Sequence, residues 1–145
     1  MASRLPRNGY ILGLDVGDKR IGVALASVIA RLPQPLEVIL ADDTAYERIR
    51  KLVEKENVQL IVVGIPRNLD GEETHQSQKI RQFAAELSQN IKTPIEFADE
   101  SLSSKRAEEA VKHNQLKNFS QDSLAACFIL EAFLGSMDTV NGDNL

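Results

Sequence analysis

The stretch LDVGDKRIGVAL, residues 14–25, places a charged turn between two apolar runs. Apolar residues at 10–14 lead into the turn, and a second run covers residues 21–26. Gly17 is free to adopt the positive φ that a tight turn favours, so the stretch predicts a β-hairpin. A third strand is expected over residues 36–40, which makes the first part of the chain an antiparallel meander.

The apolar pattern changes its period after this meander. Residues 60–65 (LIVVGI) form a continuous apolar run, as in strands that are buried on both faces of a parallel sheet. A shorter strand is expected over residues 94–98. Helical spacing of apolar residues predicts helices over residues 46–53, 80–87, 103–113 and 120–134. The order predicts an α/β fold, a mixed sheet of three antiparallel strands followed by parallel strands, with helices on both faces.

The composition is that of a globular protein. Of the 145 residues, 43% are hydrophobic and 26% are charged, which is enough apolar material for one core. We expect a single domain over residues 1–135 and a polar tail over residues 136–145. The formal net charge of -4 argues against a protein that coats nucleic acid through overall positive charge. A local basic patch is still compatible with a nucleic-acid substrate.

Cysteine content and the first residues bear on the cellular compartment. Cys127 is the single cysteine, so no disulfide can form within the chain and a reducing compartment is expected. The first ten residues, MASRLPRNGY, lack the apolar segment of a signal peptide. Apolar runs are also too short to span a bilayer. We therefore predict a cytoplasmic protein, a monomer or a homodimer, that does not associate with membranes.

Three carboxylates stand at the ends of predicted elements. Asp15 ends the first strand, Glu100 follows the last strand, and Asp122 lies in the first turn of the last helix. Ligands gather outside strand ends in such sheets, and carboxylate oxygens suit Mg²⁺ or Mn²⁺. Each acid also has a purely structural alternative, as a turn residue or as a favourable charge at a helix N-terminus. Asp122, however, shares a helix face with the buried stripe, where a carboxylate needs a metal or a cation.

Basic residues lie near these acids in the sequence or at the same expected end of the sheet. They are Lys19, Arg20, Arg67, Lys105 and Arg106. Such a distribution is what contacts with the phosphates of a nucleic acid require, although a group of charges is often only a solvated surface. Asp99 is adjacent to Glu100 and could exchange roles with it.

Four segments of the chain resemble, in order, the YqgF-type family. They are GLDVGDKRIGVALAS, VVGIPRNLDGEE, ADESLSS and QDSLAACFILEAFL. The family is RNase H-like, is related to Holliday junction resolvases and is described as candidate pre-16S rRNA nucleases. The resemblance implies an RNase H-like fold and a divalent-metal nuclease that acts on ribosomal RNA precursors in bacteria. It places the family's acidic residues on Asp15, Glu100 and Asp122.

Two positions depart from the family pattern. Ser101 stands where the family usually has an arginine after the glutamate, and Val28 stands where an aspartate usually follows the serine of the second strand. The missing arginine removes a partner for a phosphate or a carboxylate. Arg67, Lys105 or Arg106 could replace it.

The residues predict a metal-dependent nuclease, and the resemblance implies that it processes the 16S rRNA precursor. Other activities stay open. A Holliday-junction DNA resolvase is one alternative, and a non-catalytic RNA- or protein-binding module is another. A nucleotide-binding phosphotransferase or ATPase is disfavoured, because such folds need two domains around a nucleotide. The chain also lacks the GxxxxGK[ST] motif of P-loop proteins.

Overall fold

The structure, a computed structural model, describes residues 5–66, 74–99 and 120–143. Its five strands form one mixed sheet in the order β3-β2-β1-β4-β5. The strands are β1 (Tyr10–Val16), β2 (Arg20–Ser27), β3 (Gln34–Leu40), β4 (Val58–Ile65) and β5 (Ile95–Asp99). The first three pair antiparallel, whereas β4 and β5 run parallel to β1. The predicted meander and the predicted parallel strands are thus confirmed.

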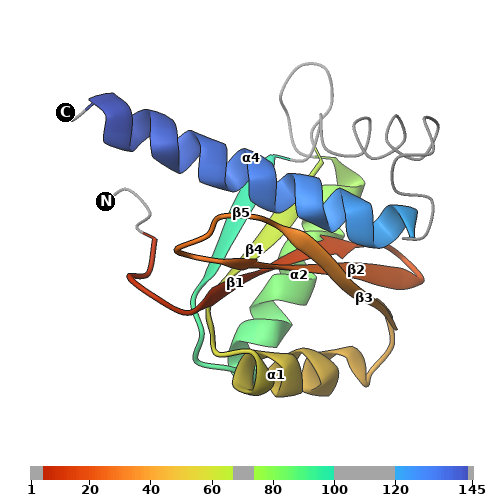
Figure 1. The fold of residues 1–145 in the computed structure, drawn as a ribbon. Helices are drawn as coiled ribbons and strands as arrows, with labels where there is room; N and C mark the ends of the chain where they lie inside the picture. The colour runs from red at the N-terminus through yellow and green to blue at the C-terminus, as the bar shows by residue number, and fades with distance from the viewer. Residues whose placement is uncertain (1–4, 67–73, 100–119, 144–145) are drawn as a thin grey trace.

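Helices cover both faces of the sheet, as predicted (Figure 1). The helices α1 (Ala45–Lys55) and α2 (His75–Asn90) lie on one face, and α4 (Gln121–Asp143) lies across the other. Labels follow Figure 1. The helix predicted over residues 103–113 lies outside the described residues.

The sheet separates two hydrophobic cores, because successive side chains of a strand point to opposite faces. The α1/α2 core is built on Leu12, Leu14, Ile21, Val23, Ile61 and Val63. The α4 core is built on Ile11, Ala24, Ala26, Leu60, Val62 and Leu130. Strands β1 and β4 contribute bulky side chains to both cores, which is why their sequences are almost continuously apolar.

Helix α4 begins where the sequence predicts and ends later. The Ser120 hydroxyl accepts a hydrogen bond from the Ser123 amide at 3.1 Å, which caps the first turn. The helix was expected to end near Leu134, yet it continues to Asp143. Met137 lies one turn further on and packs against the α4 core, so a longer helix buries more apolar surface. The division between a domain at 1–135 and a tail at 136–145 stays a prediction.

Candidate active site at the carboxyl end of the sheet

Asp15 faces helix α4. Ile11 packs in the α4 core, so the two-residue period of a strand directs Gly13 and Asp15 to the same face. A Cβ atom added to Gly13 would lie 2.6 Å from the Leu130 side chain, which shows how closely α4 approaches this face. Asp15 is half-buried near the end of β1.

Gly22 brings the first turn of α4 next to Asp15. It pairs directly with Asp15 across the β1–β2 ladder, and such partners have Cα atoms about 4.5–5.5 Å apart with side chains on one face. A Cβ atom on Gly22 would lie 1.9 Å from the carbonyl oxygen of Asp122. The helix backbone therefore rests on the space that a side chain at position 22 would fill. The contact places the backbone of Asp122 on Gly22, the ladder partner of Asp15.

Gly22 was missed in the sequence analysis. A glycine in the interior of a strand often marks a close approach of another backbone, and that signal was available in RIGVAL. The reason given for Gly17 was also wrong, because the structure does not place Gly17 at positive φ. Gly17 is needed for space, since its amide donates to the Arg20 carbonyl at 2.9 Å and a Cβ atom would lie 2.8 Å from that oxygen.

Arg20 forms an ion pair with Asp122. The Arg20 Nε donates to Asp122 Oδ2 at 3.0 Å, and the two side chains are 64% and 36% exposed. The alternation along β2 explains the contact, because Arg20 shares the α4 face with Gly22. The expectation that Asp122 needs a metal or a cation is met here by a guanidinium. An ion pair this exposed contributes only about 0–1 kcal/mol to stability.

The carboxyl end of the sheet gathers the C-terminal ends of β1, β4 and β5. Leu14 pairs with Val63, and one register step later Gly64 pairs with Ala98, so the three strands reach this end together. Glu100 follows β5 in the sequence but lies outside the described residues, as do Arg67, Lys105 and Arg106. Among the described residues, no group of three His, Cys, Asp or Glu side chains could hold a metal ion.

Asp99 is the last residue of β5. It is in register with Ile65, a residue of the α1/α2 core, whereas its neighbour Ala98 packs against the α4 core. Side chains at adjacent strand positions face opposite sides of the sheet. The exchange of roles between Asp99 and Glu100 stays a prediction, because Glu100 lies outside the described residues.

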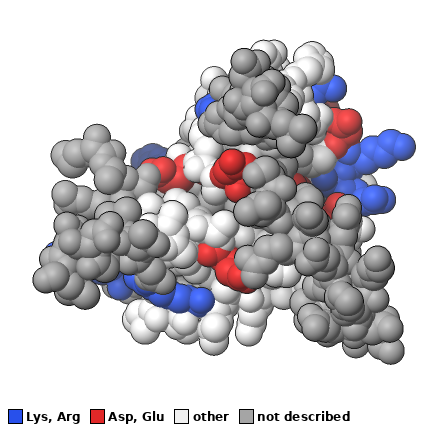
Figure 2. Space-filling view, turned by 90° about the horizontal axis from the view of Figure 1, so that it is seen from above, with Lys and Arg blue, Asp and Glu red and all other residues white. Residues whose placement is uncertain are grey.

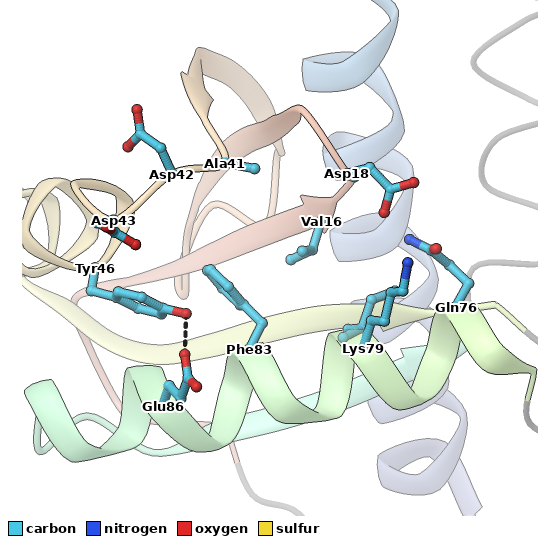
Figure 3. A pocket seen from close by; sticks show the side chains of 12 residues that line it. Val16, Asp18, Ala41, Asp42, Asp43, Tyr46, Gln76, Lys79, Phe83 and Glu86 are labelled. Carbon is cyan, nitrogen blue, oxygen red and sulfur yellow. Dashed lines mark hydrogen bonds between the residues drawn. The ribbon is translucent and has the colours of Figure 1, made fainter.

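A polar pocket of about 270 Å³ lies under the same hairpin on the opposite face (Figure 3). Asp18 hangs into it from the β1–β2 turn, opposite Lys79 of α2. The Tyr46 hydroxyl donates to Glu86 Oε2 at 2.5 Å, and the Tyr46 ring stacks on Phe83 with centroids 5.1 Å apart. Burial, with the Glu86 carboxylate beside it, raises the pKa of Tyr46 to about 12. These contacts of Tyr46 link α1 to α2. The pocket lies on the opposite side of the sheet from Asp15.

Charges on the surface seen from above, on the α4 side, are mixed (Figure 2). Acidic side chains reach the surface near the centre of this view, and the described Lys and Arg side chains lie toward its margins. The described part of this surface is therefore not a continuous basic patch. The formal net charge of the chain, -4, is likewise not that of a basic protein.

Comparison with known proteins identifies the family. The model of the RuvX family, described as Holliday junction resolvase, matches residues 9–136. The chain belongs to the RuvX family. The resemblance to the YqgF-type proteins is thereby confirmed.

Two relatives are similar over most of their length. A protein of Sulfurihydrogenibium sp. (strain YO3AOP1), named "Putative pre-16S rRNA nuclease", is 38% identical over 135 residues, which cover 90% of this chain and 93% of the relative. A protein of Orientia tsutsugamushi (strain Ikeda) with the same name is 38% identical over 134 residues, covering 88% and 84%.

A solved structure shows the fold. The Thermus thermophilus RuvC in complex with a Holliday junction substrate aligns with a TM-score of 0.53 over 90% of this chain and 97% of that one, at 14% identity. The chain therefore has the RuvC-like RNase H fold. In the described ranges, no helix has the length and apolar character needed to cross a membrane.

The departure from the RuvX pattern at Val28 lies far from Asp15. Val28 is buried in the α4 core, and its amide donates to the Gly9 carbonyl at 3.0 Å. Its neighbour Ser27 pairs with Tyr10, the first residue of β1, so Val28 lies at the opposite end of the sheet from the candidate site. The second departure, Ser101, lies outside the described residues.

Proposed function

We propose that this chain is a divalent-metal-dependent nuclease that hydrolyses phosphodiester bonds in structured nucleic acid and processes the 16S rRNA precursor in the cytoplasm. The observation that carries the proposal is that the Asp122 backbone packs on Gly22, which is the ladder partner of Asp15. The names of the relatives, pre-16S rRNA nucleases, support this choice of substrate.

The acids suit a hard divalent cation. Asp15, Glu100 and Asp122 would hold Mg²⁺ or Mn²⁺, because both ions accept carboxylate oxygens. Asp122 already attracts a cation, since Arg20 pairs with it. Asp15 lies on the same face of the sheet, opposite Gly22 in the β1–β2 ladder. A bound ion would activate a water and stabilise the leaving oxygen of the phosphodiester.

Cations of the hairpin would hold the phosphates of the substrate. Lys19 and Arg20 are exposed at the turn between β1 and β2. Arg67, Lys105 and Arg106 are proposed as further phosphate contacts from the sequence alone. Contacts with phosphates position a nucleic acid without selecting its sequence. We therefore expect the enzyme to choose its substrate by shape.

A covalent nucleophile from the chain is not required. Cys127 is buried in the α4 core, and burial together with the nearby Glu131 charge raises the pKa of its thiol to about 12. Only a thiolate is a competent nucleophile, so Cys127 stays protonated and inert at neutral pH. Water is the attacking group in the proposed reaction.

The test is a cleavage assay with two substrates. Purified protein is incubated with structured precursor rRNA and with a four-way DNA junction, each with Mg²⁺, with Mn²⁺ or with EDTA. We expect metal-dependent cleavage of the precursor rRNA, and a fall of about 100-fold or more in Asp15→Asn and Asp122→Asn, because each removes a charged ligand. Asp43→Asn is the matched control, since Asp43 is an exposed acid outside the site.

The other outcomes separate the alternatives. Preferred cleavage of the junction would establish a DNA resolvase in place of an rRNA nuclease. RNA binding without cleavage, equal in the wild type and in Asp15→Asn, would establish a non-catalytic binding module. Cleavage that persists in EDTA would contradict the metal-dependent mechanism.

A further inference from the structure

We infer that Arg20 and a divalent ion compete for Asp122, so that the Arg20 guanidinium is a built-in stand-in for the metal. This inference rests on the proposed function, because it presumes that Asp122 is a metal ligand. When the ion binds, Arg20 is released toward the phosphates of the substrate. Arg20 would thus act as a positioning residue with two alternative partners.

The ion pair has the accessibility that an exchange requires. Arg20 Nε lies 3.0 Å from Asp122 Oδ2, so the guanidinium holds one of the two carboxylate oxygens. The Asp122 side chain is 36% exposed and the Arg20 side chain 64% exposed. An ion can therefore reach the carboxylate from solvent, and a phosphate can reach the guanidinium. A buried pair would resist such an exchange, because an uncompensated charge would be left inside the protein.

The backbone fixes which partner must move. The Asp122 carbonyl is seated on Gly22, and the Ser120 cap holds the first turn of α4. The carboxylate therefore has a fixed anchor, whereas Arg20 carries its charge on a long side chain with several rotatable bonds. The exchange needs only a change of the Arg20 rotamer and leaves the fold unchanged.

Electrostatics makes the two cations exclusive. A divalent ion beside a guanidinium is repelled by it, and both seek the same oxygen atoms. The free protein should therefore bind metal more weakly than its carboxylates alone would allow. A phosphate that engages Arg20 relieves this competition, so metal and substrate should each strengthen the binding of the other. The Arg20 guanidinium would thus occupy the Asp122 carboxylate until a substrate phosphate binds Arg20.

The experiment measures the affinity of the full-length protein for Mn²⁺ alone, without nucleic acid, by calorimetry and by the EPR signal of free Mn²⁺. Arg20→Gln is expected to bind Mn²⁺ about threefold more tightly than the wild type, which corresponds to the loss of a weak exposed ion pair. Lys19→Gln is the matched control. It removes one positive charge from the same hairpin and leaves the pair with Asp122 intact, so its affinity should change less. Circular dichroism checks that each variant is folded.

The outcomes separate this inference from the proposed function. Unchanged or weaker Mn²⁺ binding in Arg20→Gln would overturn the inference, and so would an equal gain in Lys19→Gln, which would show only a general effect of charge. In both cases Asp122→Asn would still bind Mn²⁺ more weakly than the wild type, and the proposed metal site would stand. Wild-type binding that Asp122→Asn does not reduce would overturn the metal site and the inference together.

Discussion

The two faces of the β1–β2 hairpin differ in the size of most of their side chains. On the α4 face, glycines and alanines such as Gly13, Gly22 and Ala24 let a helix backbone approach the strands closely. On the α1/α2 face, bulky residues such as Leu14 and Val23 fill the space below the helices. A helix backbone that touches a strand directly leaves no side chain that can change its rotamer, whereas large side chains can repack. The acids Asp15 and Asp122 lie on the α4 face, where the packing tolerates less added side-chain volume.

The largest effect is expected from Gly22→Ala. The new methyl group would lie 1.9 Å from the Asp122 carbonyl oxygen, which is backbone and cannot rotate away. We expect a loss of about 3 kcal/mol in the free energy of unfolding and loss of cleavage, because the first turn of α4 must move away from Asp15. Urea denaturation gives the stability. Retention of wild-type stability and activity would contradict the role given to Gly22.

An intermediate effect is expected on the opposite face, from Tyr46→Phe. The variant loses the hydrogen bond to Glu86 and should lose about 1 kcal/mol of stability at neutral pH. Because the pKa of Tyr46 is raised to about 12, the folded state holds this proton more tightly than the unfolded state. The protonated Tyr46 hydroxyl therefore makes its full contribution to the free energy of unfolding below about pH 10. This contribution falls as the pH rises toward 12.

Titration of the tyrosinate absorbance checks this prediction. The tyrosinate absorbance of the folded wild type minus that of folded Tyr46→Phe, followed against pH, should show a transition near pH 12. Cleavage at neutral pH should be unaffected, since the sheet separates Tyr46 from Asp15. A transition near pH 10 would show that the contact with Glu86 does not persist in solution.

The smallest effect is expected at Gly135, where there is room for a side chain. Gly135 lies inside α4, and a Cβ atom there would meet nothing within 4 Å. Gly135→Ala should therefore stabilise the protein by about 0.5–1 kcal/mol, since alanine favours a helix over glycine. Thermal or urea denaturation of both variants measures the change in the free energy of unfolding. We expect an increase for Gly135→Ala and a decrease for Gly22→Ala, although the chemical change is the same. Destabilisation at both positions would contradict the distinction between the two glycines.

Much of the fold is predictable from the sequence because it depends on local patterns. The hairpin around residues 14–25, the buried strand β4 and the helix that begins after Ser120 each follow from periodicity or capping. The end of α4 is not local, because Met137 favours further helix only once the α4 core exists. Asp15 and Asp122 are identifiable from their places at element ends. The interior glycine of RIGVAL signals that a backbone packs against β2, but it does not say that this backbone is the first turn of α4.

The contact between Arg20 and Asp122 illustrates the same limit. The sequence indicates that Asp122 needs a cation and that Arg20 lies near Asp15, but the two are 102 positions apart. Only the register of β1 with β2 and the seat of α4 on Gly22 place them together. Electrostatic needs are thus visible in sequence, whereas the partner that meets them depends on tertiary packing.

The seat of α4 on Gly22 has a consequence for how such a site can change. The helix makes this contact through a backbone carbonyl, so the identity of the side chain at position 122 does not determine where the helix lies. Gly22 on β2 sets where the first turn of α4 lies, whereas the residue at position 122 sets which side chain the helix presents there. Evolution or protein engineering can therefore change the side chain at position 122 while the helix backbone keeps its position. The same fold can then present a different chemical group at this point.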